Sequence, residues 1–166
     1  MLENKCKTYL ITGGEGFIGR KLVDKLLTQG HKIIVIDNNI TSYEREEITN
    51  VKVIHECVSK AKVTENLDGI FHLASVAAPR LFSKQIFNVI LPNITGTMNM
   101  LEHAKENGCR LLYALSSEVY GDLGILSQQK ITESGFGYHK LLSEKSVYSS
   151  SKSMGEELIR QAQNQS

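Results

Sequence analysis

A glycine-rich turn between an apolar run and an amphipathic run constrains the fold of this chain more than any other feature. Residues 8–12 predict a buried strand, and residues 17–29 carry apolar side chains at helical spacing. Between them lies the run Gly13-Gly-Glu-Gly16-Phe-Ile-Gly19. Its glycines permit a tight turn and let backbone N–H groups approach a phosphate at the helix N-terminus. This order predicts a dinucleotide-binding turn, against the alternative of a glycine-rich turn without a ligand.

Strand and helix patterns continue to alternate along the chain. Further strands are predicted at 32–37, 51–55, 69–74 and 110–116, a helix that includes 96–105, and a last helix over 147–163. Strands separated by helices imply right-handed crossovers and a parallel sheet covered on both faces. The predicted fold class is α/β, a Rossmann-type doubly wound parallel sheet of about five strands. We expect one domain over residues 1–166.

An acidic residue ends the second predicted strand. Asp37 lies at the position where a carboxylate accepts a hydrogen bond from the 2′-hydroxyl of a cofactor ribose and repels a 2′-phosphate. NAD is therefore the predicted cofactor, rather than NADP. Arg45 follows in the polar stretch 38–50, so the sequence leaves NADP open.

A tyrosine and a lysine stand four residues apart in Tyr148-Ser-Ser-Ser-Lys152. In a helix this spacing puts both side chains on one face. A nearby ammonium favours the phenolate of a tyrosine and lowers its pKa, so the pair is suited to moving a proton on or off a hydroxyl. The alternative for this pair alone is an incidental contact on the surface.

Composition excludes several other classes. A net charge of +1 argues against a dominant nucleic-acid or anionic-membrane partner. Cys6, Cys57 and Cys109 are scattered, which predicts neither a metal cluster nor a disulfide framework and fits a reducing compartment. The N-terminus has no signal-peptide pattern, and no apolar run reaches membrane-spanning length. We expect a cytoplasmic protein.

Several motifs together resemble the extended short-chain dehydrogenase/reductase family, in particular its NAD-dependent nucleotide-sugar epimerases, dehydratases and decarboxylases. The resemblance covers nearly the whole chain. The motifs are Gly13 to Gly19, Asp37, His72-Leu-Ala-Ser75, Asn93-Ile-Thr-Gly-Thr-Met-Asn99, Ser116-Ser-Glu-Val-Tyr-Gly-Asp122 and Tyr148-Ser-Ser-Ser-Lys152-Ser-Met-Gly-Glu156.

The resemblance implies roles for individual residues. Tyr148 would remove a proton from a sugar hydroxyl, Lys152 would hold the nicotinamide ribose, and Ser116 would hydrogen-bond the reacting hydroxyl. Glu118 would be either a fourth catalytic residue or a solvated loop acid. The implied cofactor-binding residues are Gly13, Gly16, Phe17, Ile18, Gly19, Asp37, Asn38, Glu56, Cys57, Leu73, Ala74, Ser75, Tyr148 and Lys152.

The branch of the family and the substrate stay open at this level. Ser117 replaces an aspartate that the dehydratases carry, and Ser116 to Asp122 is close to a run in UDP-glucuronate decarboxylases. Those decarboxylases usually have an arginine where this chain has Lys145, whereas the run from Ser151 to Glu156 looks more like the epimerases. The implied substrate is a nucleotide-sugar, with a UDP-sugar favoured. His72 is expected to be a packed histidine rather than a catalytic residue.

Members of that family are much longer than this chain. They add further strands and a smaller substrate domain after the helix that carries the tyrosine and lysine. The C-terminal strands and the substrate domain are therefore expected to be missing here. Such a chain is expected to form a homo-oligomer, or to need a partner chain that supplies the missing half. The alternative to an enzyme is a nucleotide-binding module without turnover.

Overall fold

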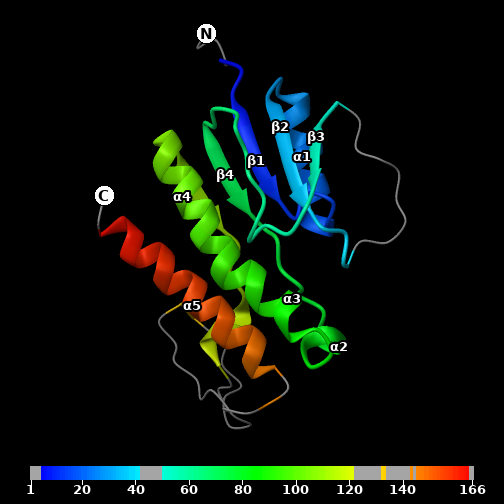
Figure 1. The fold of residues 1–166 in the computed structure, drawn as a ribbon, viewed down its shortest axis with the longest axis vertical. Helices are drawn as coiled ribbons and strands as arrows, with labels where there is room; N and C mark the ends of the chain where they lie inside the picture. The colour runs from blue at the N-terminus through cyan, green and yellow to red at the C-terminus, as the bar shows by residue number, and fades with distance from the viewer. Residues whose placement is uncertain (1–4, 42–49, 122–131, 134–142, 144, 165–166) are drawn as a thin grey trace.

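The computed structural model describes residues 5–41, 50–121, 132–133, 143 and 145–164 (Figure 1). Its centre is a parallel sheet of five strands in the order β3-β2-β1-β4-β5. The strands are β1 (Thr8–Thr12), β2 (Lys32–Asp37), β3 (Lys52–His55), β4 (Gly69–His72) and β5 (Arg110–Tyr113). The predicted α/β class, the parallel sheet and the number of strands are confirmed.

Seven helical segments connect or follow these strands in the described part of the chain. The α-helices are α1 (Phe17–Thr28), α2 (Pro79–Phe82), α3 (Ile86–Leu91), α4 (Thr97–Asn107) and α5 (Ser146–Gln163), and a π-helical turn, Pro92–Gly96, joins α3 to α4. A short 3₁₀ helix, Ser117–Tyr120, follows β5. In Figure 1, α4 and α5 run side by side along one side of the sheet.

Apolar residues fill both faces of the sheet because neighbouring strand residues point to opposite sides. Leu10, Ile34 and Ile36 pack in one cluster with Met100 of α4, whereas Ile11 of β1 belongs to a second cluster. That second cluster also contains Ile33 and Val35 from β2 and Val23 and Leu26 from α1. Continuous apolar runs such as those of β1 and β2 are typical of strands buried on both faces.

The boundaries of the elements differ from the sequence prediction mainly at the ends of the strands. Strands β4 and β5 end at His72 and Tyr113, two and three residues before the predicted limits of 74 and 116. The chain leaves the ladder there because Ala74 N donates to the Thr12 side chain and because the 3₁₀ helix begins at Ser117. The short helices α2 and α3 and the π-helical turn that follows them were not predicted. Pro92, which lacks an N–H, interrupts the regular helical hydrogen bonds at this point.

The polar stretch 38–50 and the residues 127–146 before the last helix lie mostly outside the described residues. Helix α5 begins at Ser146, one residue earlier than predicted. Tyr148 and Lys152 are therefore both helical, as the spacing argument required.

Helix α5 approaches its neighbours closely at one glycine. A Cβ atom on Gly155 would lie 2.4 Å from Tyr113 Oη of β5 and 2.7 Å from Asn93 O of the π-helix. Both distances are well below van der Waals contact, and the second atom belongs to backbone. The close packing of α5 against the strand and the π-helix therefore depends on the absence of a side chain at this position.

We predict that Gly155→Ala lowers the free energy of unfolding by about 1–3 kcal/mol, because the added methyl group overpacks the contact. Alanine is otherwise favoured over glycine within a helix, so propensity alone predicts the opposite sign. Ser150→Ala, at an exposed position of the same helix, is the matched control and is expected to be neutral. Urea denaturation of the three proteins checks this, and a stabilised Gly155→Ala protein would contradict the packing.

Candidate functional site

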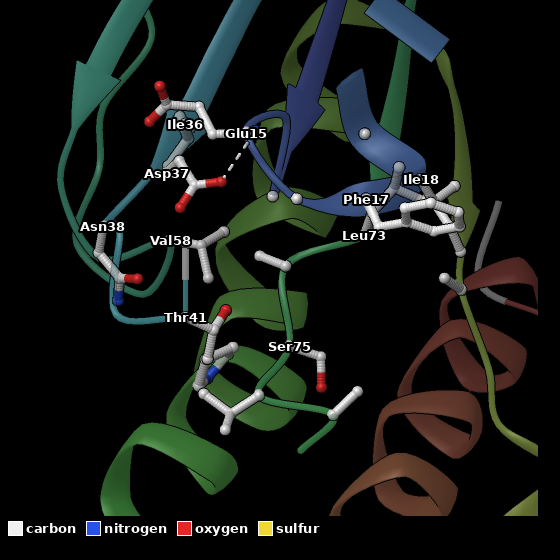
Figure 2. A pocket seen from close by; sticks show the side chains of 18 of the residues that line it. Glu15, Phe17, Ile18, Ile36, Asp37, Asn38, Thr41, Val58, Leu73 and Ser75 are labelled. Atoms are coloured by element: carbon white, nitrogen blue, oxygen red, sulfur yellow. Dashed lines mark hydrogen bonds between the residues drawn. The ribbon is translucent and has the colours of Figure 1, made fainter. Parts of the chain in front are cut away.

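A pocket of about 430 Å³ lies at the carboxyl ends of the strands (Figure 2). Parallel strands of an open α/β sheet present their ligand sites at this edge. The volume is within the range of small-molecule and cofactor sites. The predicted cofactor residues that line it are Gly13, Gly16, Phe17, Ile18, Gly19, Asp37, Asn38, Glu56, Leu73, Ala74 and Ser75. Their assignment to a cofactor stays a prediction, but the fold does bring them together.

The glycine loop has the shape of a phosphate cradle. Gly13 has a left-handed φ of 70°, and a Cβ atom there would lie 2.8 Å from Ala74 N. A Cβ atom on Gly19 would lie 2.1 Å from Gly13 O, so the loop and α1 touch through bare backbone. Gly16 is the N-cap of α1 and offers no side chain to its first N–H groups, and the first turn carries no acid. These donors, with the positive end of the helix dipole, fit a pyrophosphate.

Asp37 is held in place by two backbone donors. Its Oδ2 accepts a hydrogen bond from Glu15 N at 3.0 Å, and its Oδ1 accepts one from Asn39 N at 3.0 Å. Figure 2 shows the first of these bonds as a dashed line beside the pocket. A carboxylate fixed in this way keeps lone pairs for a ribose hydroxyl, so the residues present fit the adenosine end of NAD.

Glu15 is a lining residue that the sequence analysis did not single out. It stands between Gly14 and Gly16, where a large charged side chain is conspicuous in a loop that otherwise consists of glycines. That contrast was the available signal. Cys57, by comparison, was predicted to bind the cofactor but does not line the pocket, and its Sγ lies 3.1 Å from Ser59 Oγ.

A buried histidine ties the pocket wall to the helices. His72 Nδ1 lies 2.7 Å from Thr12 Oγ1, and Nε2 lies 3.1 Å from Pro92 O. Thr12 Oγ1 also accepts from Ala74 N at 3.0 Å, so its own proton is available to Nδ1, and Nε2–H donates to the Pro92 carbonyl. Burial, with a smaller contribution from the Lys152 charge, lowers the pKa of His72 to about 3. The ring is therefore neutral and serves packing, which agrees with the sequence-based expectation.

Tyr148 and Lys152 are buried residues of α5, and neither of them lines the pocket, although both were predicted to bind the cofactor. The Tyr148 ring stacks on Phe82 of α2, with centroids 4.6 Å apart, in a cluster that includes Val76 of the pocket lining. Lys152 Nζ donates to Ala114 O at 2.7 Å, and Ala114 also lines the pocket. Nζ lies 4.6 Å from the centroid of the Tyr113 ring as well. The pair is thus part of the core and is not an incidental surface contact.

The other two predicted catalytic residues stand where β5 ends. Ser116 is the N-cap of the 3₁₀ helix, and its Oγ accepts from Glu118 N at 3.3 Å. Glu118 Oε1 forms an ion pair with Lys145 Nζ at 3.3 Å, and both side chains are substantially exposed. Exposed pairs contribute little to stability. Neither Ser116 nor Glu118 lines the pocket.

Within the described residues, no group of three or more His, Cys, Asp or Glu side chains is placed to hold a metal ion. None of the described helices is both long and apolar enough to cross a membrane.

These features define a Rossmann-type dinucleotide-binding protein with a tyrosine–lysine pair beside its cofactor pocket. The chain belongs to the NAD dependent epimerase/dehydratase family, whose sequence pattern matches residues 9–166. The resemblance stated from the motifs is confirmed. NAD, the cofactor that the sequence predicted, is the cofactor of this family.

Relatives of known sequence or structure agree with this assignment. UDP-glucuronic acid decarboxylase 1 of Xenopus tropicalis is 36% identical over 159 residues, which make up 93% of this chain and 37% of that protein. The structure of epimerase Mth375 from Methanothermobacter thermautotrophicus matches with a TM-score of 0.80 and 27% identity, over 96% of this chain and 48% of that one. The structure of MoeE5 in complex with UDP-glucose and NAD matches with a TM-score of 0.73 and 25% identity. The match covers 93% of this chain and 48% of that one.

These three relatives are all more than twice as long as the matched part. The chain spans 37% of the decarboxylase and 48% of each of the two solved structures. What the longer proteins do is therefore carried to this chain only as a proposal.

The burial of Lys152 gives a testable dependence of stability on pH. Burial lowers the pKa of Lys152 from 10.5 to about 8. Between pH 8 and pH 10.5 the Lys152 side chain is protonated in the unfolded chain but not in the folded chain. The free energy of unfolding therefore rises with pH in this range and falls as the pH is lowered. We predict that, between pH 7.5 and pH 9.5, the free energy of unfolding of wild type rises by about 2 kcal/mol relative to that of Lys152→Met.

Guanidinium denaturation at several pH values checks this difference. Lys25→Met, which removes an exposed lysine from α1, is the matched control and is expected to show no such trend against wild type. A constant difference between wild type and Lys152→Met would show that the ammonium keeps its ordinary pKa.

Proposed function

We propose that this chain is the NAD-binding part of a nucleotide-sugar epimerase, dehydratase or decarboxylase, with a UDP-sugar as substrate. The observation that carries the proposal is the hydrogen bond from Lys152 to Ala114 O, because it joins the tyrosine–lysine helix to the wall of the cofactor pocket. The decarboxylase relative and the complex of MoeE5 with UDP-glucose and NAD support the substrate class.

The pocket residues have distinct tasks in this proposal. The glycine loop and the N-terminus of α1 hold the pyrophosphate. Asp37 accepts a hydrogen bond from the 2′-hydroxyl of the adenosine ribose, and residues 73–75 form the wall beside the nicotinamide half. When bound, NAD would accept a hydride from the sugar and later return it.

Tyr148 and Lys152 manage the proton. Tyr148 takes the proton of the sugar hydroxyl, and Lys152, one helical turn further along α5, holds the nicotinamide ribose. Ser116, at the end of β5, donates to or accepts from the same hydroxyl. The stacking of Tyr148 on Phe82 excludes water from one face of the phenol ring.

Residues Glu118 and Lys145 bear on the fate of the oxidised sugar. Their ion pair places one acid and one cation next to Ser116 and the start of α5. Both groups are exposed and so are available to a substrate. Among the three reaction types, the identity with a UDP-glucuronic acid decarboxylase favours loss of a carboxylate.

A second candidate is a nucleotide-binding module or one half of a split enzyme. Strand β5 is an end strand of the described sheet, and Leu112 and Leu115 are 51% and 37% exposed. An end strand with exposed apolar side chains is suited to pairing with another chain.

Two copies of this chain could also associate through α4 and α5. Such a contact would cover Met98 and Met154, which are also exposed.

Cofactor binding and turnover separate these candidates. We predict that the purified chain binds NADH, measured by nicotinamide fluorescence, and that Gly16→Val weakens binding, because a Cβ at this position would lie 3.2 Å from Gly13 O and the side chain would crowd the cradle. Tyr148→Phe is expected to retain NADH and to lose all conversion of UDP-glucuronate. Tyr9→Phe, far from the pocket on β1, is the matched control and should behave as wild type.

The outcomes discriminate clearly. Absence of NADH binding by wild type would refute the proposed function. Binding without any conversion of UDP-glucuronate or UDP-glucose would favour the module or split enzyme, and activity restored by a partner chain would identify the latter.

A further inference from the structure

Helix α5 encloses an ammonium group that has few partners. Lys152 is 2% exposed, and within the described residues Ala114 O is the one hydrogen-bond acceptor of Nζ, at 2.7 Å. The ion pairs of the described residues do not include Lys152. An ammonium carries three N–H donors, and its charge is costly to bury without compensation. Contacts other than an ion pair must therefore hold Nζ in its place.

The ring of Tyr113 faces this ammonium from β5. Lys152 Nζ lies over the ring, 4.6 Å from its centroid, and the negative face of an aromatic ring attracts a cation within roughly 6 Å. Burial raises the pKa of Tyr113, so its hydroxyl is a neutral phenol at neutral pH. Oη itself has no hydrogen-bond partner among the described residues. The part of Tyr113 that contacts the ammonium is therefore the ring face and not the oxygen.

The Tyr113 ring is itself fixed on two sides. His72 is its partner in the register of β4 and β5, and the centroids of the two rings lie 5.4 Å apart. On the helix side, the backbone of Gly155 comes so close that a Cβ atom there would overlap Tyr113 Oη. The ring is therefore held between β4 and α5 with one face toward Nζ.

The titratable side chains nearest to Lys152 in the sheet and in its own helix do not replace the ring. His72 is neutral, because burial lowers its pKa to about 3. Tyr148, one turn before Lys152, stacks on Phe82. Glu156, one turn after Lys152, is exposed, so water screens its charge.

The helices that pack on α5 supply no charged partner to Lys152 among the described residues either. Helix α3 and the π-helix contain no titratable residue. Glu118 of the 3₁₀ helix pairs with Lys145. In α4, Glu106 lies 3.7 Å from His103, and Glu102 is exposed. The Tyr113 ring is thus the main group besides Ala114 O that can stabilise the ammonium where it lies.

We propose that Tyr113 is a positioning residue for Lys152, whose ammonium it holds by its ring face beside Ala114, with the remaining N–H donors left for a bound ligand. A ring face suits this task, because it attracts the charge without the strong hydrogen bond of a carboxylate that would compete with the ligand. The inference rests on the proposed function where it concerns the ligand, since Lys152 is taken to hold the nicotinamide ribose. The contact between ring and ammonium needs no cofactor and can be tested alone.

The first test titrates Lys152 in the purified chain without cofactor, by NMR of lysines labelled with carbon-13 at Cε. The signal of Lys152 is the one that is absent from Lys152→Met. Tyr113→Phe keeps an electron-rich ring and is expected to titrate as wild type, with a pKa of about 8. Tyr113→pentafluorophenylalanine keeps the ring but reverses the charge of its face, and is expected to lower the pKa of Lys152 by about one unit.

A second variant and a control complete this series. Tyr113→3,5-difluorophenylalanine changes the ring less and is expected to give an intermediate pKa. Leu112→Ala, at the neighbouring exposed position of β5, is the matched control and should leave the titration of Lys152 unchanged. Packing alone predicts no gradation with fluorine content. Equal pKa values across Tyr113→Phe and the fluorinated variants would show that the ring only fills space, and would overturn the inference.

The second test measures NADH binding by nicotinamide fluorescence at pH 8 in the same proteins. Relative to Tyr113→Phe, the dissociation constant of Tyr113→pentafluorophenylalanine is expected to rise about fivefold, because the protonated fraction of Lys152 falls from about a half to about a tenth. A lowered pKa with an unchanged dissociation constant would overturn the part of the inference that concerns the ligand. If wild type binds no NADH but the pKa follows the fluorine series, the ring contact stands and the proposed function fails.

Discussion

The buried imidazole of His72 is the contact on which the arrangement of the site depends. It reaches Thr12 at the end of β1 on one side and Pro92 O of the π-helix on the other. Thr12 in turn holds Ala74 N, which belongs to the pocket wall. One side chain therefore sets the position of two strand ends, a helical turn and the loop that follows β4. A neutral ring suits this role, because it donates at one nitrogen and accepts at the other.

The parallel register extends this constraint across the sheet. Thr12 is paired with Ile36 of β2 and with His72 of β4, and Asp37 is paired with His55 of β3. The polar residues that end these strands must lie along one edge once the register is fixed. On the far side of the pocket, Gly155 lets α5 close onto Tyr113 and Asn93, which brings Lys152 to Ala114. The cofactor half and the proton-transfer half of the site are thus positioned by two separate close contacts.

Much of this architecture could be predicted from the sequence. Apolar runs, glycines and the spacing of Tyr148 and Lys152 are local signals, and each predicted the right kind of element. The π-helical turn could not be predicted in this way, because it results from Pro92 together with the tertiary bond between Asn93 and Ser151 of α5. The enclosure of the Glu15 carboxylate is likewise a tertiary property. A sequence shows that an acid interrupts the glycines but does not show whether water reaches it.

Two apolar side chains at the mouth of the pocket have a thermodynamic consequence. Phe17 and Ile18 are 79% and 65% exposed although they begin a helix that packs on the sheet. A ligand that covers them removes apolar surface from water, which lowers the heat capacity of the complex relative to its separate components. The binding enthalpy then becomes more favourable as the temperature rises. The temperature course of a calorimetric titration therefore reports how far a ligand extends over the first turn of α1, even where the affinity alone does not.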